Sequence, residues 1–172
     1  MIRIGVISDT HGSFAAVEAC VGLASDVDGW FHLGDYASDA KKLRELTGKP
    51  VYSVLGNCDG WGFGGEAEDV FPAPQRDSAS ERVVTVGGVR ILLCHGHMYD
   101  VDLGPYTLSY RAEEKHCAAA LYGHTHRGGL SAYGSLLMLN PGSPSRPRGS
   151  AKRSFAVLEI DNSGVNAKIV TL

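Results

Sequence analysis

The chain has 172 residues, of which 44% are hydrophobic and 20% are charged, close to the averages of globular proteins. This composition supports a sizeable hydrophobic core, argues against global disorder, and predicts a single domain over residues 1–172. The formal net charge of −3 gives no electrostatic reason to expect an extended nucleic-acid surface or binding to anionic membranes.

The four cysteines, Cys20, Cys58, Cys94 and Cys117, form no C-x-x-C pair, and a chain of this size does not need disulfides to fold. The N-terminal stretch MIRIGVISD lacks the longer apolar region of a secretory signal. No apolar run reaches the length that is needed to cross a bilayer. We therefore expect free thiols, no membrane partner and a cytoplasmic location.

The first third of the chain alternates between strands and helices. Compact apolar runs predict strands at residues 2–9, 30–35 and 51–57. Helix-like stripes follow the first two runs, with Ser13 and Ser38 as candidate N-caps and Gly48 as the stop of the second helix. This alternation predicts an α/β opening in which ligands bind at the carboxyl ends of the strands.

The remainder of the chain is richer in hairpin signals. Residues 61–74 are rich in Gly and Pro and predict a surface loop, whereas Gly87-Gly88 between two apolar runs predicts a β-hairpin. A helix is expected within residues 105–118. Further strands are predicted at 119–123, 135–140, 154–160 and 165–172, with a turn at 162–164 between the last two.

Five of the predicted strands end in Asp, Asn or His. These ends are Asp9-Thr10-His11, Gly34-Asp35, Gly56-Asn57-Cys58-Asp59, His95-Gly96-His97 and Gly123-His124-Thr125-His126. Carboxylates together with imidazoles suit divalent ions such as Mn, Fe, Co, Ni and Zn, and the absence of a cysteine cluster argues against a structural zinc site. Two such ions can stabilise both the attacking and the leaving oxygen of a phosphoryl displacement.

In this order the five motifs resemble those of the calcineurin-like metallophosphoesterases. The GNCD form at 56–59 and the NPGS segment at 140–143 are similar to the small YfcE-type phosphodiesterases of bacteria and archaea. The resemblance spans residues 2 to about 148. It implies a four-layer αββα sandwich in which two mixed β-sheets are flanked by helices.

The resemblance also implies a binuclear metal centre. Its ligands would be Asp9, His11 and His126 for one ion and Asn57, His95 and His124 for the other, with Asp35 bridging the two. The ions would be divalent, with Mn expected and Ni, Fe, Co or Zn as alternatives, and a metal-bound hydroxide would attack phosphorus. The residues expected to take part in catalysis are Asp35, Asn57, Cys58 and His95.

Cys58 departs from the pattern of much of the superfamily, in which a histidine at this position faces the leaving group. A neutral thiol is a poorer proton donor than imidazolium and adds no positive charge in the transition state. The departure therefore favours small organic or nucleotide phosphodiesters over monoesters as substrates. Whether Cys58 forms a wall of the site or takes part in the chemistry stays open at this stage.

Several nearby residues have two interpretations each. Asp59 either supports its loop or orients a ligand imidazole, and His97 either lies behind the ligands or faces substrate. Asn140 is expected to shape a turn near the site. Arg146 and Arg148 either contact the substrate phosphate or belong to a solvated loop. The aromatic residues of 61–65 either line a base pocket or pack on the surface.

Three functions fit the motifs. The first is a phosphodiesterase, the second is a phosphomonoesterase, and the third is a non-catalytic scaffold of the same fold. All seven expected ligand positions hold residues that can bind a metal, which disfavours the scaffold. A homo-oligomer is compatible with the sequence.

Overall fold

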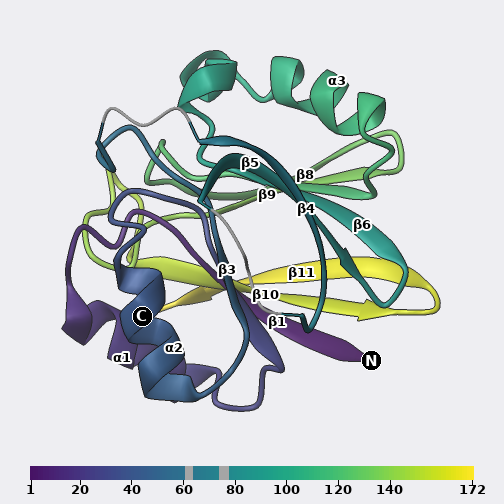
Figure 1. Ribbon diagram of the computed structural model, residues 1–172. Coiled ribbons are helices and arrows are strands. Elements are labelled where there is room, and N and C mark those ends of the chain that lie inside the picture. The colour runs from purple at the N-terminus through teal and green to yellow at the C-terminus, as the bar shows by residue number, and fades with distance from the viewer. Residues whose placement is uncertain (61–63, 74–77) are drawn as a thin grey trace.

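The computed structural model describes residues 1–60, 64–73 and 78–172, and two β-sheets pack face to face at its centre (Figure 1). The first sheet has the strand order β11 (Gly164–Thr171), β10 (Ser154–Asp161), β1 (Ile2–Ile7), β2 (Gly29–His32) and β3 (Val51–Ser53). The second has the order β4 (Gly65–Val70), β5 (Ala79–Val86), β6 (Val89–Cys94), β7 (Ala119–Leu121), β9 (Leu136–Pro141) and β8 (Gly128–Tyr133). Each sheet contains both parallel and antiparallel pairs.

Helices cover the outer faces of both sheets. Helices α1 (Phe14–Leu23) and α2 (Asp39–Thr47) lie against the first sheet, and α3 (Tyr106–Glu114) lies against the second (Figure 1). Two short 3₁₀ turns, η1 (His97–Tyr99) and η2 (Val101–Leu103), precede α3. The layers follow the order αββα, so the expected fold is confirmed. Within the described ranges no helix is long and apolar enough to span a membrane.

Both faces of each sheet are apolar because each sheet lies between two layers. On β1, Ile4 and Val6 point into the core between the sheets, whereas Ile7 packs toward α1 and α2. On β6, Leu93 joins the same central core, while Leu92 packs with the residues of α3. Burial on both faces explains why these strands have continuous apolar sequences rather than alternating ones.

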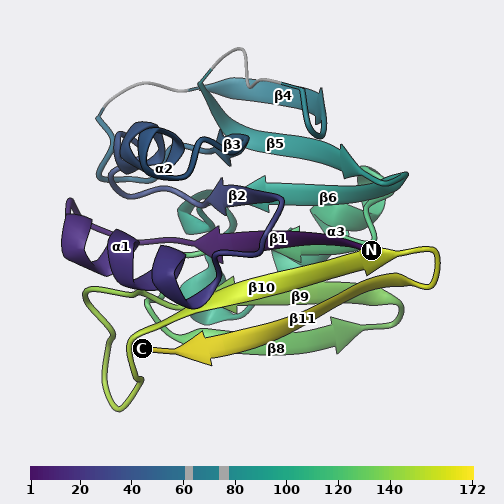
Figure 2. The same cartoon turned by 90° about the horizontal axis from the view of Figure 1, so that it is seen from below.

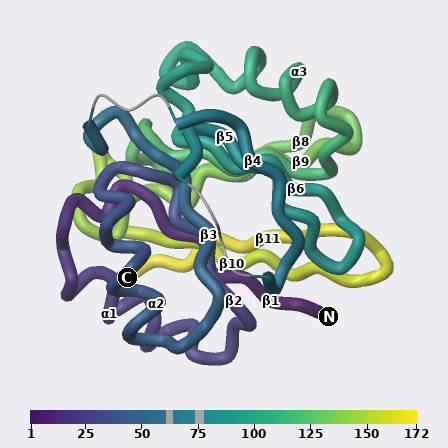
Figure 3. Tube along the Cα trace, in the orientation of Figure 1, coloured from purple at the N-terminus to yellow at the C-terminus, as the bar shows by residue number. Residues whose placement is uncertain are grey.

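The strands that precede the Asp, Asn and His motifs point their carboxyl ends toward a common side of the molecule. In Figure 2 the arrowheads of β1, β2 and β6 face the same way, and the pairings β1–β2, β2–β3, β6–β7 and β7–β9 are all parallel. The two termini lie at opposite ends of the first sheet (Figure 3). The loops that carry the Asp, Asn and His motifs therefore leave the two sheets at one shared edge.

Most of the predicted elements are confirmed, including the hairpin at Gly87-Gly88 and the helix within 105–118. Ser13 caps α1 by accepting a hydrogen bond from the backbone N of Ala16, and Gly48 ends α2 in the left-handed conformation. Ser38 precedes α2 but its side chain makes no capping hydrogen bond.

The loop expected at 61–74 was wrong in part, because residues 65–70 form β4, which pairs in parallel with β5 at the edge of the second sheet. Its sequence GEAEDV is charged and exposed, as edge strands often are, and therefore carried no strand signal. The expected aromatic lining at 61–65 involves Trp61 and Phe63, which lie outside the described residues.

Candidate metal centre

The loops after five strands bring the expected ligands to one edge of the two sheets. Asp9 and His11 follow β1, Asp35 follows β2, Asn57 follows β3, His95 follows β6, and His124 and His126 follow β7. Residues separated by more than a hundred positions in the sequence, such as His11 and His126, thus come into direct contact. Parallel strands bring their carboxyl ends to one side of each sheet, and the packing of the two sheets brings these sides together.

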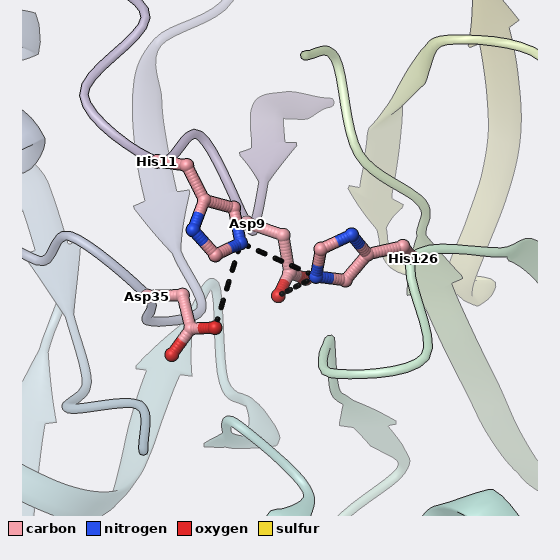
Figure 4. Close-up of side chains that lie close together, drawn as sticks. All are labelled: Asp9, His11, Asp35 and His126. Atoms are coloured by element: carbon pink, nitrogen blue, oxygen red, sulfur yellow. Dashed lines mark hydrogen bonds and ion pairs between the residues drawn. The ribbon is translucent and has the colours of Figure 1, made fainter. Parts of the chain in front are cut away.

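Four of these side chains form a compact cluster, which Figure 4 shows. Asp9, His11, Asp35 and His126 each offer one ligand atom, and the four atoms lie within 4.8 Å of one another. His126 Nε2 lies 3.1 Å from Asp9 Oδ1 and 3.2 Å from His11 Nε2. His11 Nε2 lies 3.6 Å from Asp35 Oδ2. Two imidazole nitrogens and two carboxylate oxygens at these distances form a donor set for a divalent ion of borderline softness.

The three other expected ligands lie next to this cluster. His95 Nε2 is 3.3 Å from Asp35 Oδ1 and 3.8 Å from Asp9 Oδ1. The His124 ring lies 5.3 Å from the His95 ring, and its Nδ1 is 3.1 Å from Asn57 Oδ1. The two oxygens of Asp35 therefore face different histidines, Oδ2 toward His11 and Oδ1 toward His95.

Contacts to the second ring nitrogen fix how each imidazole is oriented. His95 Nδ1 lies 2.7 Å from the carbonyl O of Leu33, and His126 Nδ1 lies 2.5 Å from that of Arg146. In each case Nδ1 donates to a backbone oxygen, which leaves Nε2 as the atom that is free to bind a metal.

Asp102 is a member of the site that sequence reasoning missed. Its Oδ2 lies 2.8 Å from His124 Nε2, so that Nδ1 of the same ring faces Asn57. Asp102 belongs to the 3₁₀ turn η2 and follows no strand. No motif marks it, and only the folded chain brings it to His124.

The burial of the polar atoms fits a bound cation. His95 Nε2 and Asp9 Oδ1 are both buried, and neither makes a hydrogen bond of good geometry within the described residues. A buried polar atom without a partner costs about 1–3 kcal/mol. A divalent ion at this position would supply the missing partner for both atoms, and the surrounding imidazole and carboxylate donors are of the kind that such ions prefer.

The electrostatics of the cluster favour a charged carboxylate. Burial acts to raise the pKa of Asp9, but the hydrogen bond to His126 and the charge of His95 outweigh it, and the pKa is lowered overall. The hydrogen bond to Asp9 raises the pKa of His126. Burial lowers the pKa of His11, and the charge of Arg146 lowers it further. An ionised carboxylate and a neutral imidazole are the forms that bind metals, so the shifts of Asp9 and His11 favour metal binding and that of His126 opposes it.

The site residues have an unusual backbone conformation. Five of them have positive φ values, which are 56° for Asp9, 47° for His11, 54° for Asp35, 69° for His124 and 57° for His126. For residues other than glycine the left-handed region costs about 1–2 kcal/mol each and clusters at functional sites. Tight turns of this kind aim consecutive side chains at a common centre.

Two glycines allow the loops to approach so closely. A Cβ at Gly56 would lie 2.3 Å from Asp35 Oδ1, and a Cβ at Gly123 would lie 1.9 Å from Ser8 Oγ. Both distances are far below the van der Waals contact of two non-bonded atoms, so any side chain at these positions would push the loops apart. The glycines next to the ligands are thus required by the packing of the site.

Cys58 lies exposed at the rim of the site. Its backbone N donates a hydrogen bond of 2.9 Å to Asp35 Oδ1. Burial and the neighbouring Asp35 carboxylate raise the pKa of the Cys58 thiol to about 11, so that the thiol is neutral at neutral pH. Asp59 accepts hydrogen bonds of 2.7 Å from the backbone N of Gly56 and of Ala37, which places it as a support of its loop.

The remaining expected residues surround the cluster. The His97 ring lies 5.4 Å from that of His95, and Arg146 and Arg148 lie exposed on the loop after β9. Asn140 is buried, and its Nδ2 donates to the carbonyl O of Gly123 and to Oγ1 of Thr125, at 2.8 and 3.0 Å. Asn140 therefore holds the turn on which the two histidines of the last motif stand.

Comparison with known proteins identifies the family of the chain. The sequence model of the calcineurin-like phosphoesterase superfamily domain matches residues 2–163. Phosphodiesterase YfcE of Escherichia coli K12 is 30% identical over 181 aligned residues, which cover 94% of this chain and 89% of that protein. A solved structure from Streptococcus pneumoniae, described as a predicted phosphoesterase, is 31% identical with a TM-score of 0.77 and coverage of 99% and 89%.

The fold is also shared by solved structures of low sequence identity. Vacuolar protein sorting 29 of Cryptosporidium parvum has a TM-score of 0.70 at 20% identity, with coverage of 99% of this chain and 97% of that one. At such identity the likeness shows the fold alone. The match of the family model over residues 2–163 is decisive, and the chain belongs to the calcineurin-like phosphoesterase superfamily.

Proposed function

We propose that the protein is a phosphodiesterase that uses two divalent metal ions and acts on small organic or nucleotide phosphodiesters. The observation that carries this proposal is the position of Asp35, whose Oδ2 lies 3.6 Å from His11 Nε2 and whose Oδ1 lies 3.3 Å from His95 Nε2. A carboxylate with its two oxygens turned toward two different histidines is suited to bridge two ions.

The proposed ligand sets follow from the contacts on each side of Asp35. Asp9, His11 and His126 would hold the first ion, and Asn57, His95 and His124 the second. Mn²⁺ is the first candidate, with Ni, Fe, Co and Zn as alternatives, because nitrogen and oxygen donors are mixed on both sides. Two ions about 3.5–4 Å apart stabilise the attacking and leaving oxygens of a phosphoryl displacement and activate water as the nucleophile.

The chain's own residues orient the ligands and shape the leaving-group side. The backbone carbonyls of Leu33 and Arg146 fix the rings of His95 and His126. The neutral thiol of Cys58 adds no positive charge next to Asp35, which favours diesters over monoesters. The guanidinium of Arg146, which is exposed at the rim of the site, would contact the reacting phosphate.

The wider setting of the enzyme is also part of the proposal. We propose that residues 1–172 act as one domain, because β10 and β11 near the C-terminus complete the sheet that β1 begins. A cytoplasmic location agrees with four unpaired cysteines. A phosphomonoesterase is the alternative activity, and the complete set of seven ligand positions disfavours the scaffold.

The proposal is tested by hydrolysis of bis(p-nitrophenyl) phosphate by the purified protein with added Mn²⁺. We expect turnover that a chelator abolishes, weaker turnover of p-nitrophenyl phosphate, and two metal equivalents per chain. Asp35→Ala is expected to lose both equivalents together. A folded protein that is inactive with Mn, Ni, Co, Fe and Zn would overturn the enzymatic function, and two equivalents retained in Asp35→Ala would overturn the bridge.

A further inference from the structure

The described arginines differ in whether their side chains have a partner, and that of Arg44 donates a hydrogen bond of 3.1 Å to the carbonyl O of Val51. Arg3, Arg82, Arg90 and Arg111 each form an ion pair with a carboxylate, as between Arg90 and Glu68 at 3.2 Å. By contrast, the side chains of Arg127, Arg146, Arg148 and Arg153 make neither an ion pair nor a hydrogen bond with any residue that the structure describes. Three of these four, Arg127, Arg146 and Arg148, lie next to His126. In a chain with a net charge of −3, three arginines without a counter-ion in one region are notable.

These arginines lie beside the metal centre. Arg127 directly follows the ligand His126, and the backbone N of Arg148 donates a hydrogen bond of 3.3 Å to the carbonyl O of His126. Arg127 and Arg148 are therefore both held next to a proposed metal ligand.

Arg127 and Arg148 line the same cavity, which has a volume of about 440 Å³. Its wall consists of Val101, Asp102, Leu103, Gly104, Thr125, Arg127 and Arg148. The cavity adjoins the metal centre, because Thr125 stands between the two histidines of the last motif and Asp102 contacts His124 at 2.8 Å. The one acidic residue of this wall is thus already engaged, whereas the two guanidinium groups are not.

The side chains that line this cavity favour an anionic ligand. Guanidinium groups present planar pairs of N–H donors that match phosphate and carboxylate oxygens. Two of them without a counter-ion repel each other, and an anionic ligand would relieve this repulsion. Arg146 does not line this cavity, and we assign it to the reacting phosphate as part of the proposed function.

We propose that the cavity lined by Arg127 and Arg148 binds a second anionic group of the substrate, carried on one arm of the phosphodiester. The inference rests on the proposed phosphodiesterase function and narrows its substrate class to diesters that bear a further phosphate or carboxylate. Such a substrate places its diester at the metal centre and its terminal anion between the two arginines.

The test compares dinucleotides that differ only in a terminal phosphate. Analogues with a methylphosphonate linkage have no charge at the diester position and are not hydrolysed, so the terminal phosphate is their only anionic group. Calorimetry on the metal-free protein is expected to show about tenfold tighter binding of the phosphorylated analogue, which corresponds to one or two charge-assisted hydrogen bonds at an exposed site. A third analogue with a terminal carboxylate distinguishes the two kinds of anion.

Variants locate the effect. In the double variant Arg127→Ala/Arg148→Ala the two analogues should bind equally, whereas Arg153→Ala, which removes an exposed arginine outside the cavity, should keep the tenfold difference. Turnover of bis(p-nitrophenyl) phosphate by the same proteins reports separately on the proposed function. Equal affinity of the unmodified protein for the two analogues would overturn the inference, and so would a preference that survives in the double variant.

Discussion

Removing the carboxylate of Asp102 is expected to weaken metal binding without any direct loss of a ligand. Asp102 Oδ2 lies 2.8 Å from His124 Nε2, and this contact leaves Nδ1 facing Asn57, its proposed partner in binding the second ion. When Asp102 is replaced by Ala, the ring can rotate and Nε2 can exchange roles with Nδ1. Metal binding then has to restore the orientation that the carboxylate held before.

The size of the effect follows from the exposure of the pair. A hydrogen bond to a charged group contributes about 1.5–3 kcal/mol. The Asp102 side chain is 55% exposed, so water competes for its hydrogen bonds. We therefore assign about 1–1.4 kcal/mol to the contribution of this contact to metal binding. About 1.4 kcal/mol corresponds to a tenfold change in affinity. Asp102→Ala should therefore bind the weaker metal equivalent about tenfold less tightly, and Asp102→Asn, which keeps an oxygen acceptor, about threefold less tightly.

Calorimetric titration of the metal-free protein with Mn²⁺ measures this change directly. Asp100→Asn is the matched control for Asp102→Asn, because it makes the same chemical change two residues away on an exposed side chain. Asparagine also tolerates the left-handed backbone at this position. At saturating Mn²⁺ we expect kcat to stay within about twofold of the original value, as for a residue that acts through a ligand. An Asp102→Ala protein that binds both equivalents as tightly as the unmodified chain would refute the positioning role.

Two further substitutions test other parts of the site. Cys58→His is expected to raise monoesterase relative to diesterase activity, because imidazolium adds a proton donor and a positive charge at the rim. An unchanged ratio of p-nitrophenyl phosphate to bis(p-nitrophenyl) phosphate turnover would contradict this prediction. Gly123→Ala should lower the free energy of unfolding by about 1–3 kcal/mol in urea titrations, because its Cβ would lie 1.9 Å from Ser8 Oγ. Gly129→Ala, where the Cβ would meet nothing within 4 Å, is the control, and equal losses in both variants would exclude the steric explanation.

Sequence reasoning was most successful where one physical cause dominates. Strands such as β1 and β6 are buried on both faces, so their continuous apolar runs identified them. The motifs after these strands could be predicted to meet because parallel strands bring their carboxyl ends to one edge. The convergence of Asp9 and His11 with His126 also requires the two sheets to pack with these ends at the same edge, which the strand patterns alone do not encode.

The features that were missed depend on contacts that no local pattern encodes. Strand β4 is held at a sheet edge by pairing with β5, and its charged sequence resembles a loop. Asp102 and Arg127 carry no periodic or motif signal. Asp102 reaches His124 only because η2 packs beside the last motif. That Arg127 lacks a counter-ion becomes visible only in the folded chain, where other arginines such as Arg111 form ion pairs.

The strained turns of the site favour an enzyme that binds metal ions over a non-catalytic scaffold of the same fold. A non-glycine residue with positive φ costs about 1–2 kcal/mol, and Asp9 and Asp35 both have this conformation. The chain offsets the cost with specific contacts: the backbone N of His124 donates to Asp9 Oδ2, and Ser143 Oγ donates to the carbonyl O of Asp9. A scaffold that needs only its surface gains nothing from buried carboxylates held in this way. Such a scaffold would relax these turns at no cost, whereas a centre that binds cations requires them.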